Sequence, residues 1–186
     1  MKKRLHHLLT AGGLIVAGLL STACGEDVEN LYSGVRAFFR FTPVTAAPPL
    51  NTALNNPGMF CTVTFARGQY HFTLSDGTSV PYSPTQIDQY GKPEYIAGFI
   101  VGTPALPDLS GNFRIAAYDL ACPNCWNDNS ITRALTFSSP AGMTCGRCHR
   151  NYDLNNDGMA SDGAGSRRKL LRYRVTYSQN TLVIQN

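Results

Sequence analysis

The chain of 186 residues is long enough for one ordinary domain and too short for two large ones. Apolar residues make up 43% and charged residues 15%, which predicts a packed core and excludes general disorder, a long coiled coil and a collagen-like chain. The formal charge is +4, but three of the 16 basic residues lie in a leader that we expect to be removed. The remaining 13 basic and 12 acidic residues give about +1, which argues against a nucleic-acid partner.

Residues 1–23 have the pattern of a bacterial lipoprotein signal peptide. A basic start at residues 2–4 precedes an apolar run at residues 8–20, which is too short to span a bilayer core. The following Ser-Thr-Ala-Cys resembles the lipobox, after which Cys24 becomes the lipidated first residue of the mature protein. Ordinary secretion with cleavage after Ala23 is the alternative. We expect a lipid anchor at Cys24 that holds the protein on a membrane with its domain in water.

An acidic stretch follows the predicted anchor. Residues 24–33 include Glu26, Asp27 and Glu29, which indicates a solvated tether. A run of this kind also resembles the surface-export signal of some bacterial lipoproteins. The expected location is therefore the bacterial cell envelope, with the chain anchored to the outer membrane and surface display as a hypothesis.

Residues 34–186 predict a single all-β domain. Alternating apolar residues and aromatic or β-branched clusters predict short strands. The expected strands cover residues 35–41, 59–65, 70–74, 95–101, 113–118, 171–177 and 181–184. Only residues 51–56 have the composition of a short helix or turn, and segments 42–58 and 77–93 are expected to be loops. Short strands at irregular spacing favour a β-sandwich or small barrel.

Two C-x2-C pairs are the most informative feature of the sequence. Cys122-Pro-Asn-Cys125 and Cys145-Gly-Arg-Cys148 are 19 residues apart, a spacing typical of zinc sites with paired cysteines. In each such turn the second thiol returns to the side of the first, and backbone N–H groups point at sulfur. Two facing turns would enclose a tetrahedral set of four sulfurs, which suits Zn²⁺ or an iron–sulfur centre.

Other chemistry stays open for these cysteines. Exported proteins meet an oxidising environment, so the four thiols could form two disulfides, or one pair could be a redox-active dithiol. The segment 145–149 also satisfies the C-x-x-C-H motif for c-type haem, which would leave the first pair without a role. We expect a metal centre, with Trp126 shielding it from water and His149 either tuning it or facing solvent.

The residues around both pairs resemble a known family. Residues 116–123 (AAYDLACP) and 145–154 (CGRCHRNYDL) look like the two cluster-binding loops of Rieske-type ferredoxin domains. A glycine-bearing loop, a leucine-containing strand and a terminal strand follow in the same order, so the resemblance covers about residues 97–186. It implies a Rieske-like β-sandwich or small barrel with metal-binding knuckle loops at 118–128 and 143–158, and electron transfer as the activity.

The ligand set departs from that family, whose domains hold a [2Fe–2S] cluster with two Cys and two His. Cys122 and Cys145 match the family's cysteines, but Asn124 and Cys148 stand where its histidines would be, and Cys125 is an additional thiol. A standard cluster is therefore not expected. Three versions remain: zinc bound by four thiolates, a [2Fe–2S] cluster held by four cysteines, or a disulfide-stapled fold without a cluster.

The sequence gives little support for an enzyme. It contains no Ser/His/Asp set, no nucleotide-binding loop and no placed pair of carboxylates, and two of its four histidines lie in the leader. If the centre is iron–sulfur, we expect an electron carrier. If it is zinc, or if disulfides replace it, we expect a binding or scaffold lipoprotein. In both cases the protein partner is unknown.

Three weaker patterns complete the prediction. Residues 153–158 (DLNNDG) match the first half of an EF-hand loop, but Ala164 stands at the twelfth position, so a polar turn is expected. Basic residues gather at 167–174, where Arg172 and Arg174 share one strand face. That face is either solvated or in contact with an acidic polysaccharide or the acidic surface of a partner. Cys61, in an apolar strand, is expected to be a buried free thiol.

Overall fold

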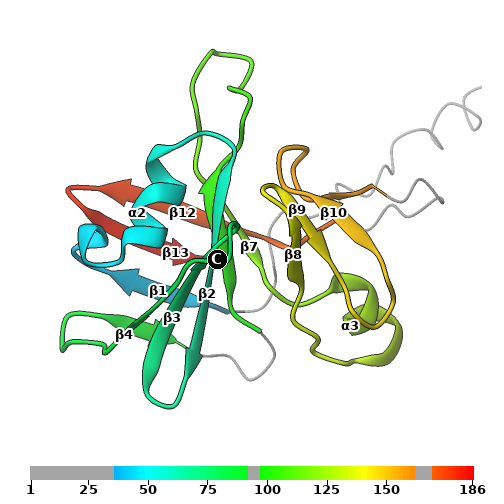
Figure 1. Cartoon of the computed structure of the whole chain (residues 1–186), viewed down its shortest axis with the longest axis horizontal. Helices are drawn as coiled ribbons and strands as arrows, with labels where there is room; N and C mark the ends of the chain where they lie inside the picture. The colour runs from blue at the N-terminus through cyan, green and yellow to red at the C-terminus, as the bar shows by residue number, and fades with distance from the viewer. Residues whose placement is uncertain (1–35, 92–96, 162–168) are drawn as a thin grey trace, which may run out of the picture. The chain divides into compact units, whose positions relative to one another are not determined.

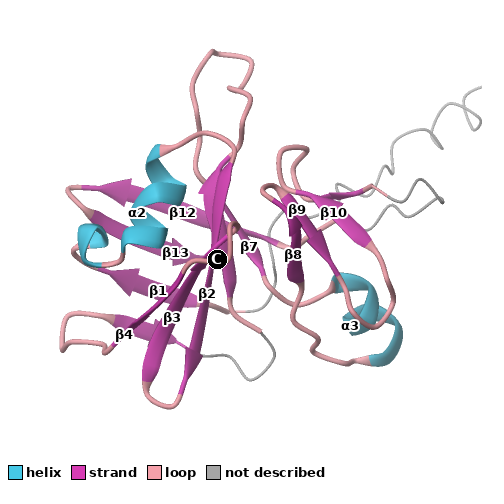
Figure 2. Cartoon of the chain, in the orientation of Figure 1, coloured by secondary structure: helices cyan, strands magenta, loops and turns pink. Residues whose placement is uncertain are grey.

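A nine-stranded antiparallel sheet and a smaller four-stranded sheet make up most of the chain that the computed structural model describes, residues 36–91, 97–161 and 169–186 (Figures 1 and 2). Two short α-helices and one 3-10 helix are the other regular elements there, which confirms the all-β fold class. The signal segment 1–23 and the tether 24–33, with Cys24, lie outside the described residues. Among the residues that the structure describes, no helix is long and apolar enough to cross a membrane.

The larger sheet has the strand order β4-β3-β2-β6-β7-β12-β13-β1-β5. Its strands are β1 (Phe38–Phe41), β2 (Met59–Ala66), β3 (Gln69–Leu74), β4 (Ser79–Tyr82), β5 (Gln89–Gly91), β6 (Phe99–Thr103), β7 (Ala116–Asp119), β12 (Arg172–Ser178) and β13 (Thr181–Gln185). Strand β12 changes partner along its length. It pairs with β7 at Arg172 and Tyr173 and with β13 from Arg174 onward.

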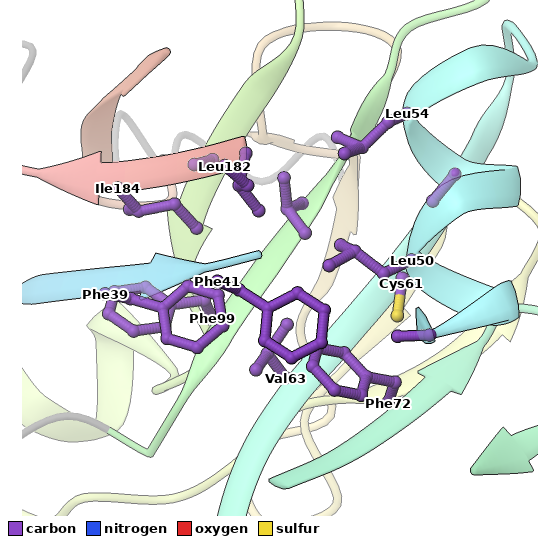
Figure 3. Packing of buried hydrophobic residues seen from close by; sticks show 14 of the residues in the cluster. Phe39, Phe41, Leu50, Leu54, Cys61, Val63, Phe72, Phe99, Leu182 and Ile184 are labelled. Carbon is purple, nitrogen blue, oxygen red and sulfur yellow. The ribbon is translucent and has the colours of Figure 1, made fainter. Parts of the chain in front are cut away.

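This sheet curls into a half-barrel around an aromatic core (Figure 3). Phe41 of β1 lies with its ring centroid 4.8 Å from that of Phe72 in β3, and Phe39 lies 5.8 Å from Phe99 in β6. Several strands separate β1 from β3 and β6 in the sheet order, so these contacts require the sheet to fold over on itself. Each aromatic pair adds about 0.5–1.5 kcal/mol beyond the burial of its surface.

One helix, whose residues the sequence predicted only in part, packs against this core. Helix α2 (Pro48–Asn55) begins three residues before the short helix or turn expected at 51–56, and it follows a 3-10 turn, η1 (Val44–Ala46). Pro48 and Pro49 occupy the first helical positions, where no N–H is needed and the fixed φ of proline suits a helix. The helix buries Leu50 and Leu54 against the half-barrel (Figure 3).

The segment expected as a loop at 77–93 contains the edge strands β4 and β5. Its Pro81 sits in β4, at the outer edge of the sheet, where a missing N–H costs no ladder hydrogen bond. The strand expected at 113–118 begins only at Ala116, and the described part of the strand expected at 95–101 begins at Phe99. These differences add two edge strands and shift the boundaries of two others, and they leave the fold class unchanged.

The smaller sheet is inserted in the chain between β7 and β12, and none of its strands was predicted. It consists of β8 (Thr136–Ser139), β9 (Gly142–Thr144), β10 (Asn151–Asp153) and β11 (Met159–Ala160), and helix α3 (Pro123–Asn129) precedes it. Strands β2, β6 and β7 contribute side chains to two hydrophobic cores. Cys61, Val101 and Ala117 face the half-barrel, whereas Phe60, Ile100 and Tyr118 belong to the cluster that includes residues of the smaller sheet.

Candidate metal centre

Four cysteine sulfurs meet at the core of the smaller unit of structure formed by helix α3 and strands β8–β11. The Sγ atoms of Cys122, Cys125, Cys145 and Cys148 all lie within 4.8 Å of one another. The pairs Cys122–Cys148 and Cys125–Cys145 are 3.6 and 3.7 Å apart, well beyond the ~2.05 Å of a disulfide bond. The structure therefore brings together the four residues that the two C-x2-C motifs singled out, as free thiols that could hold a metal ion.

The first pair is positioned by the end of β7 and the start of α3. Cys122 is the N-cap of the helix, Pro123 fills its first position, and the N–H of Trp126 donates to the carbonyl of Cys122 (3.1 Å). The N–H of Cys122 donates to the carbonyl of Arg133 (2.8 Å), which ties the turn to the chain leading into β8. One helical turn separates the two cysteines, so both thiols point to the same side.

The second pair forms the tip of the β9–β10 hairpin. Thr144 of β9 is paired with Asn151 of β10, and inside this pair the N–H of Cys145 donates to the carbonyl of Arg150 (2.9 Å). His149 has a positive φ of 58°, and its N–H donates to the carbonyl of Cys145 (2.9 Å). The register of the hairpin thus fixes the turn that carries both thiols.

Apolar side chains enclose three of the four sulfurs. Cys122, Cys125 and Cys145 are at most 1% exposed, and Cys148 is half-buried. Their cluster includes buried Leu, Ile, Phe, Met and Tyr side chains: Phe60, Ile100, Tyr118, Leu120, Leu135, Met143, Tyr152, Leu154 and Leu170. The hydroxyl of Tyr152 lies 3.5 Å from Cys122 Sγ. Sequence reasoning noted Tyr152 only as part of a loop pattern, because the contact depends on the register of β10.

Burial and hydrogen bonding act in opposite directions on these thiols. Burial raises the pKa of Cys122 and of Cys125. Burial also raises that of Cys145, but the N–H groups of Cys148 and Arg147 and the thiols of Cys148 and Cys122 hydrogen-bond to its sulfur and together lower its pKa to about 7. The two backbone contacts are N–H···S contacts of the kind expected from C-x2-C turns. They favour the thiolate, which is the form that binds metals.

A buried carboxyl group holds the first cysteine turn to the half-barrel. Asp119, 3% exposed at the end of β7, accepts hydrogen bonds from the N–H of Ala121 (2.8 Å) and from the hydroxyl of Tyr173 in β12 (3.0 Å). Burial raises its pKa to about 6, although both hydrogen bonds act in the other direction. Asp119 was not singled out in the sequence, where a lone Asp at a strand end carries no distinctive signal.

The other residues noted in the sequence fall outside this cluster. His149 is exposed and Trp126 is half-buried in α3. Cys61 is fully buried in the half-barrel, where burial raises its pKa. In the 153–158 turn, Asp157 accepts a hydrogen bond from Arg172 (3.0 Å) and lies 3.3 Å from the Tyr118 hydroxyl, so its carboxylate takes part in an ion pair.

Comparisons with known proteins give no relative: no family model, no curated protein and no solved structure matches the chain.

Tyr152→Phe tests whether the tyrosine hydroxyl supports the sulfur cluster. The substitution removes the group 3.5 Å from Cys122 Sγ and keeps the buried ring. Loss of a hydrogen bond to a metal ligand lowers metal affinity by about 10- to 100-fold, as competition with a chelator measures. Tyr70→Phe, at a buried tyrosine of the half-barrel, is the matched control and should leave the affinity unchanged. Equal effects of the two changes would contradict the assignment.

Asp119→Asn tests the buried carboxyl group. Because the pKa of Asp119 in the folded chain, about 6, exceeds the ordinary 3.8, the native state holds the proton more tightly than the unfolded state does. The protonated Asp119 therefore adds about 3 kcal/mol to the free energy of unfolding below pH 3.8. This contribution is lost as the pH rises through 6. Urea unfolding at pH 4 to 7 should show a smaller decline for the Asn variant, and parallel curves would contradict this prediction.

Proposed function

We propose that the four cysteines hold one tetrahedral zinc ion, which stabilises the smaller sheet of an exported, lipid-anchored protein. The observation that carries this proposal is the compactness of the sulfur cluster, whose members all lie within 4.8 Å of one another. With a Zn–S bond of about 2.3 Å, the sulfurs of a tetrahedral site are about 3.8 Å apart. Two of the separations, Cys122–Cys148 at 3.6 Å and Cys125–Cys145 at 3.7 Å, are close to this value.

A two-iron cluster fits this geometry less well. In a [2Fe–2S] centre two irons and two bridging sulfides lie between the two pairs of thiolates. Thiolates on different irons are therefore pushed well beyond the separation of thiolates on a single ion. A cluster in which every sulfur is within 4.8 Å of the others favours a single metal ion over the [2Fe–2S] version.

Zinc bound by four thiolates would be structural. Such a site leaves no open coordination position for a substrate, so the ion would stabilise the loops and the function would lie in binding or scaffolding. The site would carry a net charge of −2. Arg147 and Arg150 belong to the second cysteine turn, and the carbonyl of Arg133 accepts a hydrogen bond from the N–H of Cys122. Positive side chains nearby favour an anionic centre.

Electron transfer by a single iron in the same four-sulfur site is the second candidate. Tetrahedral sulfur ligation suits iron as well as zinc. The half-exposed Cys148 would give electrons a short path to a partner at the surface, and the Rieske-like pattern of the two loops supports a redox origin. In this view the insertion of both cysteine turns between β7 and β12 reflects descent from a cluster-binding domain whose ligands have changed.

The metal proposal is tested by elemental analysis and native mass spectrometry of the detergent-extracted full chain. We expect one zinc per chain, lost in Cys125→Ser and retained in Cys61→Ser, which alters a buried thiol of the other core. Removal of the ion should lower the melting temperature, because binding energy at a structural zinc site is folding energy. One iron would support the electron-transfer candidate. Two irons with acid-labile sulfide, or no metal at all, would contradict the proposal.

The proposed membrane anchor rests on the sequence of residues 1–24 alone. We expect the wild-type chain in the membrane fraction and Cys24→Ser in the soluble or uncleaved fraction, because the substitution removes the only site for acylation in the lipobox-like segment. Cys61→Ser is the control for the loss of a cysteine. Incorporation of labelled fatty acid into Cys24→Ser, or its absence from the wild-type chain, would contradict lipidation.

A further inference from the structure

In the part of the chain that the structure describes, one edge of strand β12 is paired only at the first two residues of the strand. Its first two residues, Arg172 and Tyr173, pair with Tyr118 and Ala117 of β7. Among the described residues, no strand pairs with β12 on that side beyond Tyr173. The chain before β7 departs from the sheet in the loop that rises above it in Figure 1, while β12 continues away toward its hairpin with β13. The open edge therefore lies where β12 and the chain before β7 diverge from each other.

The hairpin geometry shows which backbone groups occupy this edge. Gln179 and Asn180 form a two-residue turn with φ of 48° and 60°, which makes the flanking pair Ser178–Thr181 a hydrogen-bonded pair. Hydrogen-bonded pairs alternate along an antiparallel ladder, so residues 174, 176 and 178 bond to β13. The N–H and C=O groups of residues 173, 175 and 177 consequently point to the opposite edge. Those of Tyr173 face β7, and those of Val175 and Tyr177 face the open part of this edge.

A groove of about 500 Å³ runs along this edge, a volume typical of ligand-binding pockets, which span about 300–1,000 Å³. Half-buried Ile115, Val175 and Tyr177 line it and pack against the half-barrel core. The groove thus combines unpaired strand backbone with an apolar base, which are the two features that a docked β-strand requires.

The lining of this groove is cationic. It includes Arg114, Arg172 and Arg174, and none of the described residues that line the groove is acidic. Arg114 forms an ion pair with Asp108, and Arg172 with Asp157. Arg174 is exposed, and the side chains of Arg172 and Asp157 are 30% and 43% exposed. Ion pairs at the surface contribute at most about 1 kcal/mol, so a ligand carboxylate can exchange with Asp157.

We propose that this groove binds an extended acidic segment of a partner protein, which adds as a strand antiparallel to β12 beside Val175 and Tyr177. Alternate side chains of the segment would be apolar and cover Ile115, Val175 and Tyr177, and those between them would be acidic and face Arg172 and Arg174. Backbone hydrogen bonds would supply affinity, and the alternation would supply specificity. The binding does not depend on the metal proposed for the four cysteines.

The experiment titrates the detergent-extracted full chain with the blocked peptide Thr-Val-Glu-Val-Glu-Val-Thr at physiological salt, followed by calorimetry. Two further peptides separate the contributions. One replaces both glutamates by lysine, and the other carries N-methyl groups on its valine amides, which removes the hydrogen bonds to β12 and keeps both charges. We expect saturable 1:1 binding of the glutamate peptide and at least tenfold weaker binding of the other two.

A charge reversal in the protein gives a second readout. Arg174→Glu should weaken binding of the glutamate peptide at least tenfold and strengthen binding of the lysine peptide. Arg67→Glu, at an exposed arginine of the β2–β3 turn, is the matched control and should change neither. Absence of saturable binding, equal affinity for the N-methylated peptide, or no effect of Arg174→Glu would overturn the proposal.

Discussion

Four thiol groups that lie within 4.8 Å of one another must share either protons or a cation, because four adjacent thiolates would repel one another in surroundings that contain little water. The smaller sheet depends on how this constraint is met. Its strands have only two to four residues, and the sulfurs connect the turn before it to the hairpin tip within it. A cation at the centre would bind all four sulfurs, and these bonds would be the strongest interaction in that part of the molecule.

The half-barrel provides the rigid support for this cluster. Phe60, Ile100 and Tyr118 extend from its central strands into the second core, so the cysteine turns pack against strands that are buried on both faces. Asp119 adds a polar link, because it binds the Tyr173 hydroxyl on β12 and the Ala121 N–H directly before Cys122. The larger sheet therefore holds the inserted segment at β7, where it begins, and at β12, where it ends. The geometry of the site depends on both attachments.

The sequence predicted the elements that have strong periodicity and missed those that do not. Alternating apolar residues located β3 and β12, and the paired cysteines located the site. Strands β8–β11 were missed because segments of two to four residues are too short to show a period. Most of helix α2 was expected to be a loop because segment 42–58 is rich in Pro, Thr, Asn and Ser, although prolines at the first positions of a helix favour its start. The proximity of Tyr152 and Cys122 depends on hairpin register, which spacing alone does not give.

Zinc K-edge X-ray absorption of the purified chain is the most direct test of the central claim. A single tetrahedral zinc site predicts one shell of four sulfurs at about 2.3 Å, with no nitrogen or oxygen ligand. A shell that includes nitrogen or oxygen would mean that at least one of the four cysteines is not a ligand. Absence of a zinc edge, together with an iron edge and a short metal–metal distance, would contradict the single-ion account and restore the two-iron cluster.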